Sequence, residues 1–158
     1  MRTTRLLPAA FLAAVALAGC ASGLNDATSR EHATPWVANA TVGSVDVRDV
    51  TISPATGGSG AQAYLSLALV SSKPDQLTGA TLSAGGTVTP TVPGASFSMT
   101  PNQLLSIPDP ETPTTLPGLA ITGLTTLPQV GTTMQVTLTF RDAGQVQLQV
   151  PVRDAPIS

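Results

Sequence analysis

Between Gly131 and Val152 the chain reads GTTMQVTLTFRDAGQVQLQVPV, and this stretch decides the fold. Apolar and polar residues alternate on both sides of a short break, which is the pattern of two β-strands with one apolar face each. The break is Asp142-Ala143-Gly144, and Gly144 is the residue best able to adopt the positive φ of a tight hairpin loop. We therefore predict an antiparallel hairpin whose apolar face forms one wall of the core. That face comprises Met134, Val136, Leu138, Phe140, Val146, Leu148 and Val150.

A hairpin alone is at best marginally stable in water, so further strands must cover this wall. Short segments that are apolar or alternating recur upstream with turn residues between them, which is typical of a β-sandwich. They are residues 42–52, 61–70, 76–82, 86–89, 95–100, 104–107 and 119–124. In the first segment the apolar face changes near Arg48 and Asp49, which predicts a bulge or a bend. We predict an all-β fold, an antiparallel β-sandwich.

The N-terminus has the pattern of a bacterial lipoprotein signal peptide. Arg2 and Arg5 precede an apolar run over residues 6–18, which is shorter than the roughly 20 residues that a membrane-spanning helix needs. The run leads into the tetrapeptide LAGC, a lipobox, whose last residue is Cys20. We predict that residues 1–19 are cleaved off and that Cys20 becomes the lipidated N-terminus. The alternative is an ordinary secretory leader with an accidental cysteine.

Lipidation of Cys20 would place the protein at the extracytoplasmic face of the cell membrane. Each buried CH₂ of an acyl chain, such as palmitate, contributes about 0.8 kcal/mol, and stable anchoring takes more than one chain. Cys20 is the only cysteine, so a disulfide framework is excluded.

The mature chain divides into three parts. Residues 20–40 are predicted to be the lipidated N-terminus and a flexible tether, residues 41–153 the β-sandwich, and residues 154–158 a C-terminal tail. The tether holds His32, the only histidine, which is expected to be solvated. It also holds Trp36, which either docks back onto the domain or touches the envelope.

Charge excludes one class of partner. The mature chain has five basic residues against nine carboxylates, and the basic residues are scattered. Nucleic-acid binding requires a basic patch, so we predict none.

The residues do not suggest an enzyme. Nucleophilic catalysis needs a base, and no histidine or cysteine follows His32. Lys73 lies in a Ser-Ser-Lys-Pro turn and is expected to be solvated rather than part of a Ser-Lys dyad. Residues 57–60, GGSG, lack the Lys-Ser/Thr of a phosphate-binding loop and are predicted to be a flexible loop.

Two pairs of acids are close in sequence, Asp46 with Asp49 and Asp109 with Glu111. A glycosidase needs two acids in a cleft, and Ca²⁺ needs six or more oxygen ligands. We expect both pairs to be exposed turn or edge acids.

Several phrases, in their order and spacing, resemble the PCu(A)C family of extracytoplasmic copper chaperones, and in particular its lipobox-bearing members from high-GC Gram-positive bacteria. The phrases are residues 63–67 (AYLSL), 75–80 (DQLTGA), 99–101 (MTP), 107–108 (IP), 123–124 (GL), 131–132 (GT) and 136–140 (VTLTF), followed by Gly144. The resemblance implies an immunoglobulin/cupredoxin-like β-sandwich over about residues 40–152.

The resemblance also implies Cu(I) as a ligand, bound by a histidine after the fourth strand, a central methionine and a His-x-Met pair. Thioether and imidazole suit a soft cuprous ion. The first histidine corresponds to residues 89–91 and the His-x-Met pair to residues 117–123, and neither stretch holds a histidine or methionine. Met99 matches the central methionine, although a lone methionine is more often an apolar core or surface residue than a ligand. Met99 and His32, folding back from the tether, are therefore the candidate metal ligands, unless a partner protein completes the site. No cofactor follows from the residues themselves.

We predict a membrane-anchored extracytoplasmic lipoprotein that acts by binding. It takes part in copper handling through a divergent site, or it has lost that site. The alternative is a structural or accessory envelope lipoprotein that binds a protein partner and no metal, through loops at residues 53–60 and 108–117. The surroundings of Met99 distinguish these hypotheses, because a buried Met99 removes the last family ligand.

Overall fold

The computed structural model describes residues 36–56, 60–110 and 116–154. The chain separates into two compact units, residues 1–33 and 34–158, and the fold below belongs to the second. The predicted signal peptide, Cys20, His32 and Glu111 lie outside the described residues.

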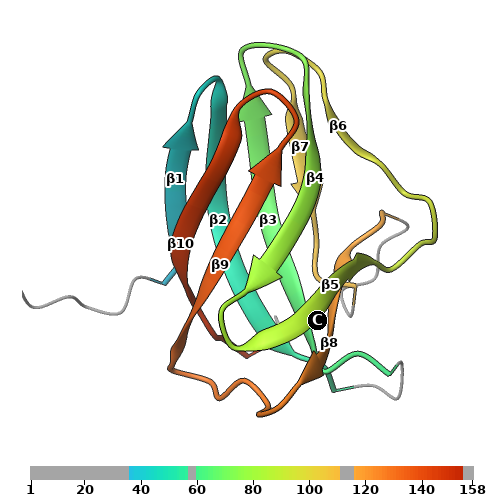
Figure 1. Cartoon of the computed structure of the whole chain (residues 1–158), viewed down its shortest axis with the longest axis vertical. Helices are drawn as coiled ribbons and strands as arrows, with labels where there is room; N and C mark the ends of the chain where they lie inside the picture. Colours follow the sequence, from blue (N-terminus) through green and yellow to red (C-terminus); the bar gives the residue numbers. More distant parts are fainter. Residues whose placement is uncertain (1–35, 57–59, 111–115, 155–158) are drawn as a thin grey trace, which may run out of the picture. The chain divides into compact units, whose positions relative to one another are not determined.

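The described residues form one antiparallel sheet of ten strands (Figure 1). The strands are β1 (Ala38–Val42), β2 (Val45–Pro54), β3 (Ala63–Ser71), β4 (Asp75–Leu82), β5 (Gly85–Pro90), β6 (Phe97–Met99), β7 (Leu104–Ile107), β8 (Leu119–Leu124), β9 (Thr133–Phe140) and β10 (Gly144–Pro151). Their order across the sheet is β1-β2-β3-β8-β5-β4-β9-β10, with β6 paired to β4 and β7 paired to β3. Within these ranges no helix is long and apolar enough to cross a membrane.

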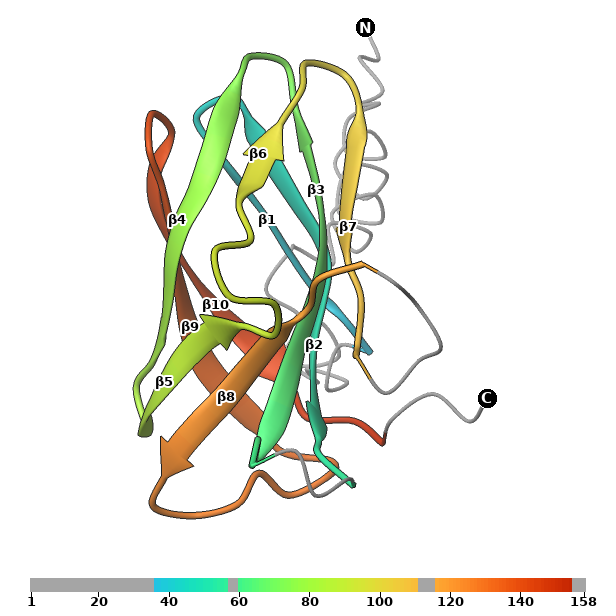
Figure 2. The same ribbon diagram turned by 90° about the vertical axis from the view of Figure 1, so that its right-hand side faces the viewer.

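The sheet folds over on itself into two layers. Figure 2 shows β4, β9 and β10 on one side and β2, β3 and β7 on the other. The end of β10 returns to β2, where Val152 and Ile52 form a parallel bridge. The predicted all-β sandwich is confirmed.

The core lies between the two layers and consists of aliphatic side chains with few aromatic ones. The largest of its fully buried members are Ile52, Leu65, Leu69, Ile107, Ile121 and Leu138. Burial of such apolar surface is the main force that holds the layers together.

The hairpin of β9 and β10 has the predicted geometry. Phe140 pairs with Gly144 across the three-residue loop Arg141–Ala143, and Gly144 has a φ of 93°. On its inner face five residues are buried and two, Met134 and Val146, are half-buried. The five are Val136, Leu138, Phe140, Leu148 and Val150.

The predicted bulge lies in β2. Between Arg48 and Thr51 this strand holds one residue more than its neighbours on either side, and Asp49 takes a φ of 53°. The extra residue brings Val50 and Ile52 back to the face of the preceding valines, so all are buried. Strict alternation along the sequence places Val50 and Ile52 on the face opposite Val45 and Val47, because it does not count the extra residue of the bulge.

The folded part begins earlier than predicted. Residues 42–44 are not part of a strand continuous with β2, since the chain turns at Gly43 and Ser44 and the preceding strand β1 starts at Ala38, inside the range assigned to the tether. The side-chain oxygen of Asn39 accepts a hydrogen bond from the Asp49 N–H at 2.9 Å, which ties β1 to the bulge.

A single carboxylate holds the hairpin loop. Asp75 begins β4 and is 5% exposed. Its Oδ1 accepts hydrogen bonds from the N–H groups of Gln76 at 2.7 Å and Asp142 at 3.0 Å, and its Oδ2 accepts one from the Ala143 N–H at 2.9 Å. Burial raises the pKa of Asp75, but backbone hydrogen bonds from Gln76, Asp142, Ala143 and Arg141 together outweigh it. The pKa therefore lies below its ordinary value of 3.8.

Replacement of Phe140 tests the hairpin wall. Phe140 is 3% exposed and pairs with Leu77 of β4. Phe140→Ala removes a buried ring and leaves a cavity, so we expect a loss of about 3–5 kcal/mol in the free energy of unfolding, measured by urea denaturation. Gln145→Ala, on the exposed side of the same hairpin, should change it little. A loss below about 1 kcal/mol for Phe140→Ala would mean that the ring does not pack in the core.

Replacement of Asp75 tests the loop clamp. Asp75→Asn should cost about 1–3 kcal/mol near pH 7, because buried donors lose a charged acceptor. The unfolded chain binds the Asp75 proton more readily than the folded chain does, so this stability is complete above pH 3.8 and is lost as the pH falls through the lower folded pKa. The gap in unfolding free energy between the two proteins should narrow below pH 3.8; a gap that is constant with pH contradicts the clamp.

Candidate functional site

The structure brings together two segments that correspond to copper-ligand positions in the resemblance. Pro90 at the end of β5 pairs with Leu119 at the start of β8. Beyond the pair, the Thr91 N–H donates to the Gly118 carbonyl and the Gly118 N–H donates to the Thr91 Oγ1, both at 2.9 Å. Residues 89–91 and 117–123 are thus neighbours, as a shared site requires.

The third segment, β6, carries Met99 and pairs with the same edge of β4 as β5 does, at the opposite end of that strand. Met99 pairs with Asp75 at the start of β4, is 3% exposed and belongs to the hydrophobic core. A core role therefore accounts for this methionine, as the sequence allowed. The location of its proposed partner, His32, lies outside the described residues.

A pocket of about 270 Å³ lies among these segments. It is bordered by β4, β5, β8 and the chain before and within β6. Its lining comprises Gln76, Leu77, Thr78, Gly79, Ala80, Val88, Pro90, Ala95, Ser96, Phe97 and Leu119, and Met99 is not among them. The pocket is therefore lined by apolar side chains with a few uncharged polar ones.

The polar lining groups are hard oxygen and nitrogen donors that already bond to each other or to the backbone. Gln76 Nε2 donates to Ser96 Oγ at 2.8 Å, and Thr78 Oγ1 donates to the Thr139 carbonyl at 3.0 Å. A cuprous ion prefers thioether, thiolate and imidazole ligands. The side chains that line this pocket do not fit Cu(I).

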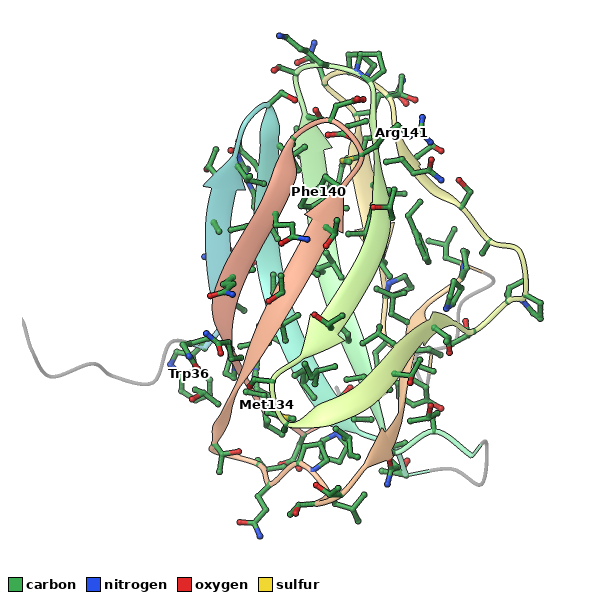
Figure 3. The ribbon with its side chains drawn as sticks, viewed as in Figure 1. Trp36, Met134, Phe140 and Arg141 are labelled. Carbon is green, nitrogen blue, oxygen red and sulfur yellow. The ribbon has the colours of Figure 1, made fainter. Side chains whose placement is uncertain are left out.

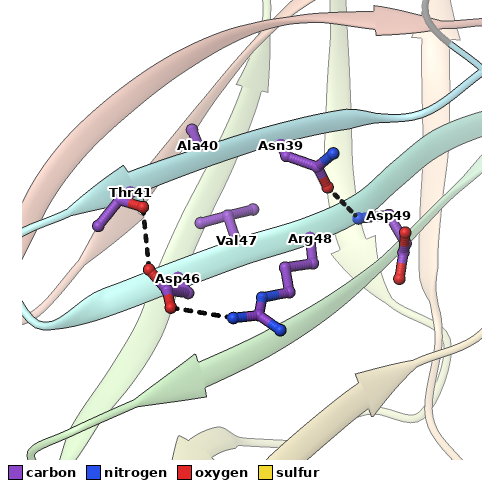
Figure 4. Close-up of a pocket in the computed structure, with 7 residues that line it drawn as sticks. All are labelled: Asn39, Ala40, Thr41, Asp46, Val47, Arg48 and Asp49. Carbon is purple, nitrogen blue, oxygen red and sulfur yellow. Dashed lines mark hydrogen bonds and ion pairs between the residues drawn. The ribbon is translucent and has the colours of Figure 1, made fainter.

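A second, shallower depression lies over β1 and β2 (Figure 4). Arg48 and Asp46 form an ion pair at 3.2 Å, with side chains 57% and 42% exposed, and Thr41 Oγ1 donates to Asp46 at 2.9 Å. Asp49 is exposed as well. This pair of acids lies on the surface, as predicted, and an exposed ion pair contributes little to stability.

In the second pair of acids, Asp109 is the member that the structure describes, and its position corrects the prediction. Asp109 was expected to be exposed, but it is 5% exposed, and its carboxylate accepts a hydrogen bond from the hydroxyl of Ser53, which is 4% exposed. The segment around it packs closely, because a Cβ on Gly118 would lie 2.9 Å from the Pro108 carbonyl oxygen. Ser53 and Asp109, which lie in the described parts of the predicted loops 53–60 and 108–117, therefore meet, and Asp109 serves the packing of the domain.

Sequence reasoning missed Asp75 and Asp109 as buried acids. Each follows or precedes a proline in a segment with turn residues, a context that favours exposure. Their partners are 67 and 56 residues away, respectively, so no local signal reveals them.

The predicted exposure of Lys73 is correct. Over the described ranges, no three His, Cys, Asp or Glu side chains form a group that could hold a metal ion.

The sequence matches a family model described as "Putative lipoprotein LpqE-like" over residues 45–152. No curated protein matches it.

Solved structures with a similar fold include PCuAC domains. The copper-bound PCuAC domain from PmoF2 is 17% identical with a TM-score of 0.61, covering 74% of this chain and 98% of that domain. The apo PCuAC domain from PmoF1 is 17% identical with a TM-score of 0.62, covering 74% and 99%. The apo PmoF2 domain is 19% identical with a TM-score of 0.60, covering 75% and 97%. The expected PCu(A)C-like fold is confirmed.

Proposed function

The chain belongs to the LpqE-like family, and from that premise we propose that it is an extracytoplasmic lipoprotein, held on the cell membrane by lipid on Cys20, that binds an envelope protein through its PCu(A)C-like domain. The observation that carries this proposal is the pocket between β4, β5, β6 and β8. Pro90 and Leu119, from the two segments to which the resemblance assigns histidine and methionine ligands, border this pocket, and its lining is mostly apolar with a few uncharged polar groups.

Membrane anchoring is supported by the leader and by the family. The family model carries the description "Putative lipoprotein", and the order of charged residues, apolar run and LAGC tetrapeptide is the order that lipid attachment to Cys20 needs. The lipid then keeps the sandwich at the membrane surface.

Binding rather than catalysis fits the chemistry of the domain. The buried carboxylates of Asp75 and Asp109 are engaged in hydrogen bonds that hold loops together. The pocket offers no side chain that could act as nucleophile and base together. An apolar pocket with a few polar groups suits the capture of an apolar side chain from another protein.

Copper handling is the second candidate, because one of the solved structures with this fold is copper-bound. The two methionines of the domain cannot share one ion. Met99 lies beside Asp75 at the start of β4, whereas Met134 lies two residues from Val136, which pairs with Leu82 at the end of β4. These ends are roughly 20 Å apart at the usual rise of a strand. Cu(I) would thus need donors from outside the domain.

A Cu(I) titration distinguishes the two candidates. The chain without its leader is titrated against a competing chelator, beside Met99→Leu and His32→Ala. We expect all three proteins to leave Cu(I) with the chelator, because a single thioether or imidazole does not hold it. Tight binding by the wild type that either substitution abolishes would establish a rebuilt copper site and overturn the proposal of a metal-free partner-binding domain.

Fractionation of cells tests the anchor. Cys20→Ala removes the thiol that carries the lipid, so we expect the protein to move from the membrane fraction to the soluble fraction. Ser22→Ala, two residues further on, should stay with the membrane. Unchanged membrane association of Cys20→Ala would refute lipidation at this residue.

A further inference from the structure

One end of the domain exposes three large apolar side chains near the point where the N-terminal segment joins it. Trp36 is 79% exposed, Leu127 62% and Val130 49%. In Figure 3, Trp36 lies at the lower end of the domain, opposite the hairpin loop marked by Arg141, and the β8–β9 connection that carries Leu127 and Val130 lies at the same end in Figure 1.

Backbone hydrogen bonds connect these residues. The Gly131 N–H donates to the Val152 carbonyl at 2.9 Å, and the Val152 N–H donates to the Thr132 carbonyl at 2.8 Å. The next residue, Arg153, places its guanidinium 5.6 Å from the centre of the Trp36 ring and donates from Nη1 to the Trp36 carbonyl at 3.3 Å. Trp36 and the chain next to Val130 are thus both tied to residues 152–153.

The geometry fixes the indole but leaves it open to solvent. Arg153 holds the ring by a cation–π contact, yet most of the ring is not covered. Leu127 and Val130 lie on either side of Pro128, which is buried and anchors the loop. A held tryptophan at the same end of a domain as exposed aliphatic side chains is typical of a surface that enters the boundary between lipid headgroups and acyl chains.

The N-terminal segment argues for a bilayer as the occupant of this surface. Trp36 lies 16 positions after Cys20, and even a fully extended segment of that length spans at most about 55 Å. A lipid on Cys20 would therefore hold the domain near the bilayer, with the covalent connection at the Trp36 end and not at the hairpin end.

We propose that Trp36, Leu127 and Val130, the Trp36 patch, form a lipid-contacting surface that docks the domain onto the membrane that carries its anchor. This inference rests on the lipid anchor proposed above. Arg153 is followed by Asp154, so the patch carries little net charge. Docking should therefore depend on apolar insertion and be insensitive to salt and to the share of anionic lipid.

Trp36 is the only tryptophan, so its fluorescence reports on the patch alone. The lipidated full chain is reconstituted into vesicles of phosphatidylcholine and phosphatidylglycerol, with or without brominated acyl chains. We expect Trp36 emission to shift to the blue, to be quenched by brominated lipid, and to be protected from aqueous iodide. Raising the salt concentration should leave the quenching unchanged.

Paired variants separate the patch from the anchor. Leu127→Ser with Val130→Ser keeps the reporter and removes the aliphatic part, so quenching by brominated lipid should be lost. Leu104→Ser is the matched control, because Leu104 is 67% exposed and pairs with Val70 at the other end of β3. Brominated lipid should quench the Trp36 emission of this variant as much as it quenches that of the wild type.

The outcomes that overturn the inference are distinct from failure of the anchor. Protein that floats with the vesicles while Trp36 stays accessible to iodide, or quenching that the double variant does not change, would overturn the patch alone. Shielding of Trp36 only in native membranes would assign the surface to an envelope protein instead of lipid. Protein that does not float with vesicles at all would overturn both the anchor and the patch.

Discussion

The carboxylate of Asp75 is the interaction on which the rest of the domain depends. It lies at the start of β4 and accepts hydrogen bonds from the loop between β9 and β10, so one buried charge fixes how the hairpin meets its neighbour. β4 in turn pairs with β5, β6 and β9. The cost of burying a carboxylate is offset only if its lone pairs find donors, and here the backbone supplies them. This contact joins the start of β4 to the hairpin loop, and the three ladders hold the rest of β4 and the pocket beside it.

The pocket shows which contacts join the segments that border it. Reciprocal hydrogen bonds between Thr91 and Gly118 join segments 89–91 and 117–123. Leu119, Pro90 and Phe97 line the space between the strands. Fold and ligand set are therefore separate properties of this chain, and a likeness of fold at 17–19% identity says nothing of the ligand.

Alternation of apolar residues predicted most of the fold, because period 2 is a local property of a half-buried strand. It located the hairpin, the positive φ of Gly144 and the bulge near Asp49. It failed where the deciding contact is distant in sequence. β1 is short, and its pairing with β2 depends on the turn at Gly43, which the alternation of apolar residues does not reveal. Asp109 lies between two prolines, a context that predicts exposure, but its hydrogen bond with Ser53 holds it in a buried position. The family resemblance matched Met99 to the central methionine but could not tell a ligand from a core residue, because methionine suits both.

The topology of the sheet also determines which part of the domain would bear mechanical load. In the part of the chain that the structure describes, β1 forms a hydrogen-bonded ladder with β2 alone, and it is the first strand after the N-terminal segment. A force transmitted through that segment therefore acts on the β1–β2 ladder before it reaches the core. Trp36 lies before β1 in the chain, so its contact with Arg153 would break before the ladder does. The domain thus has a graded resistance to tension, in which two peripheral contacts would break before the sandwich does.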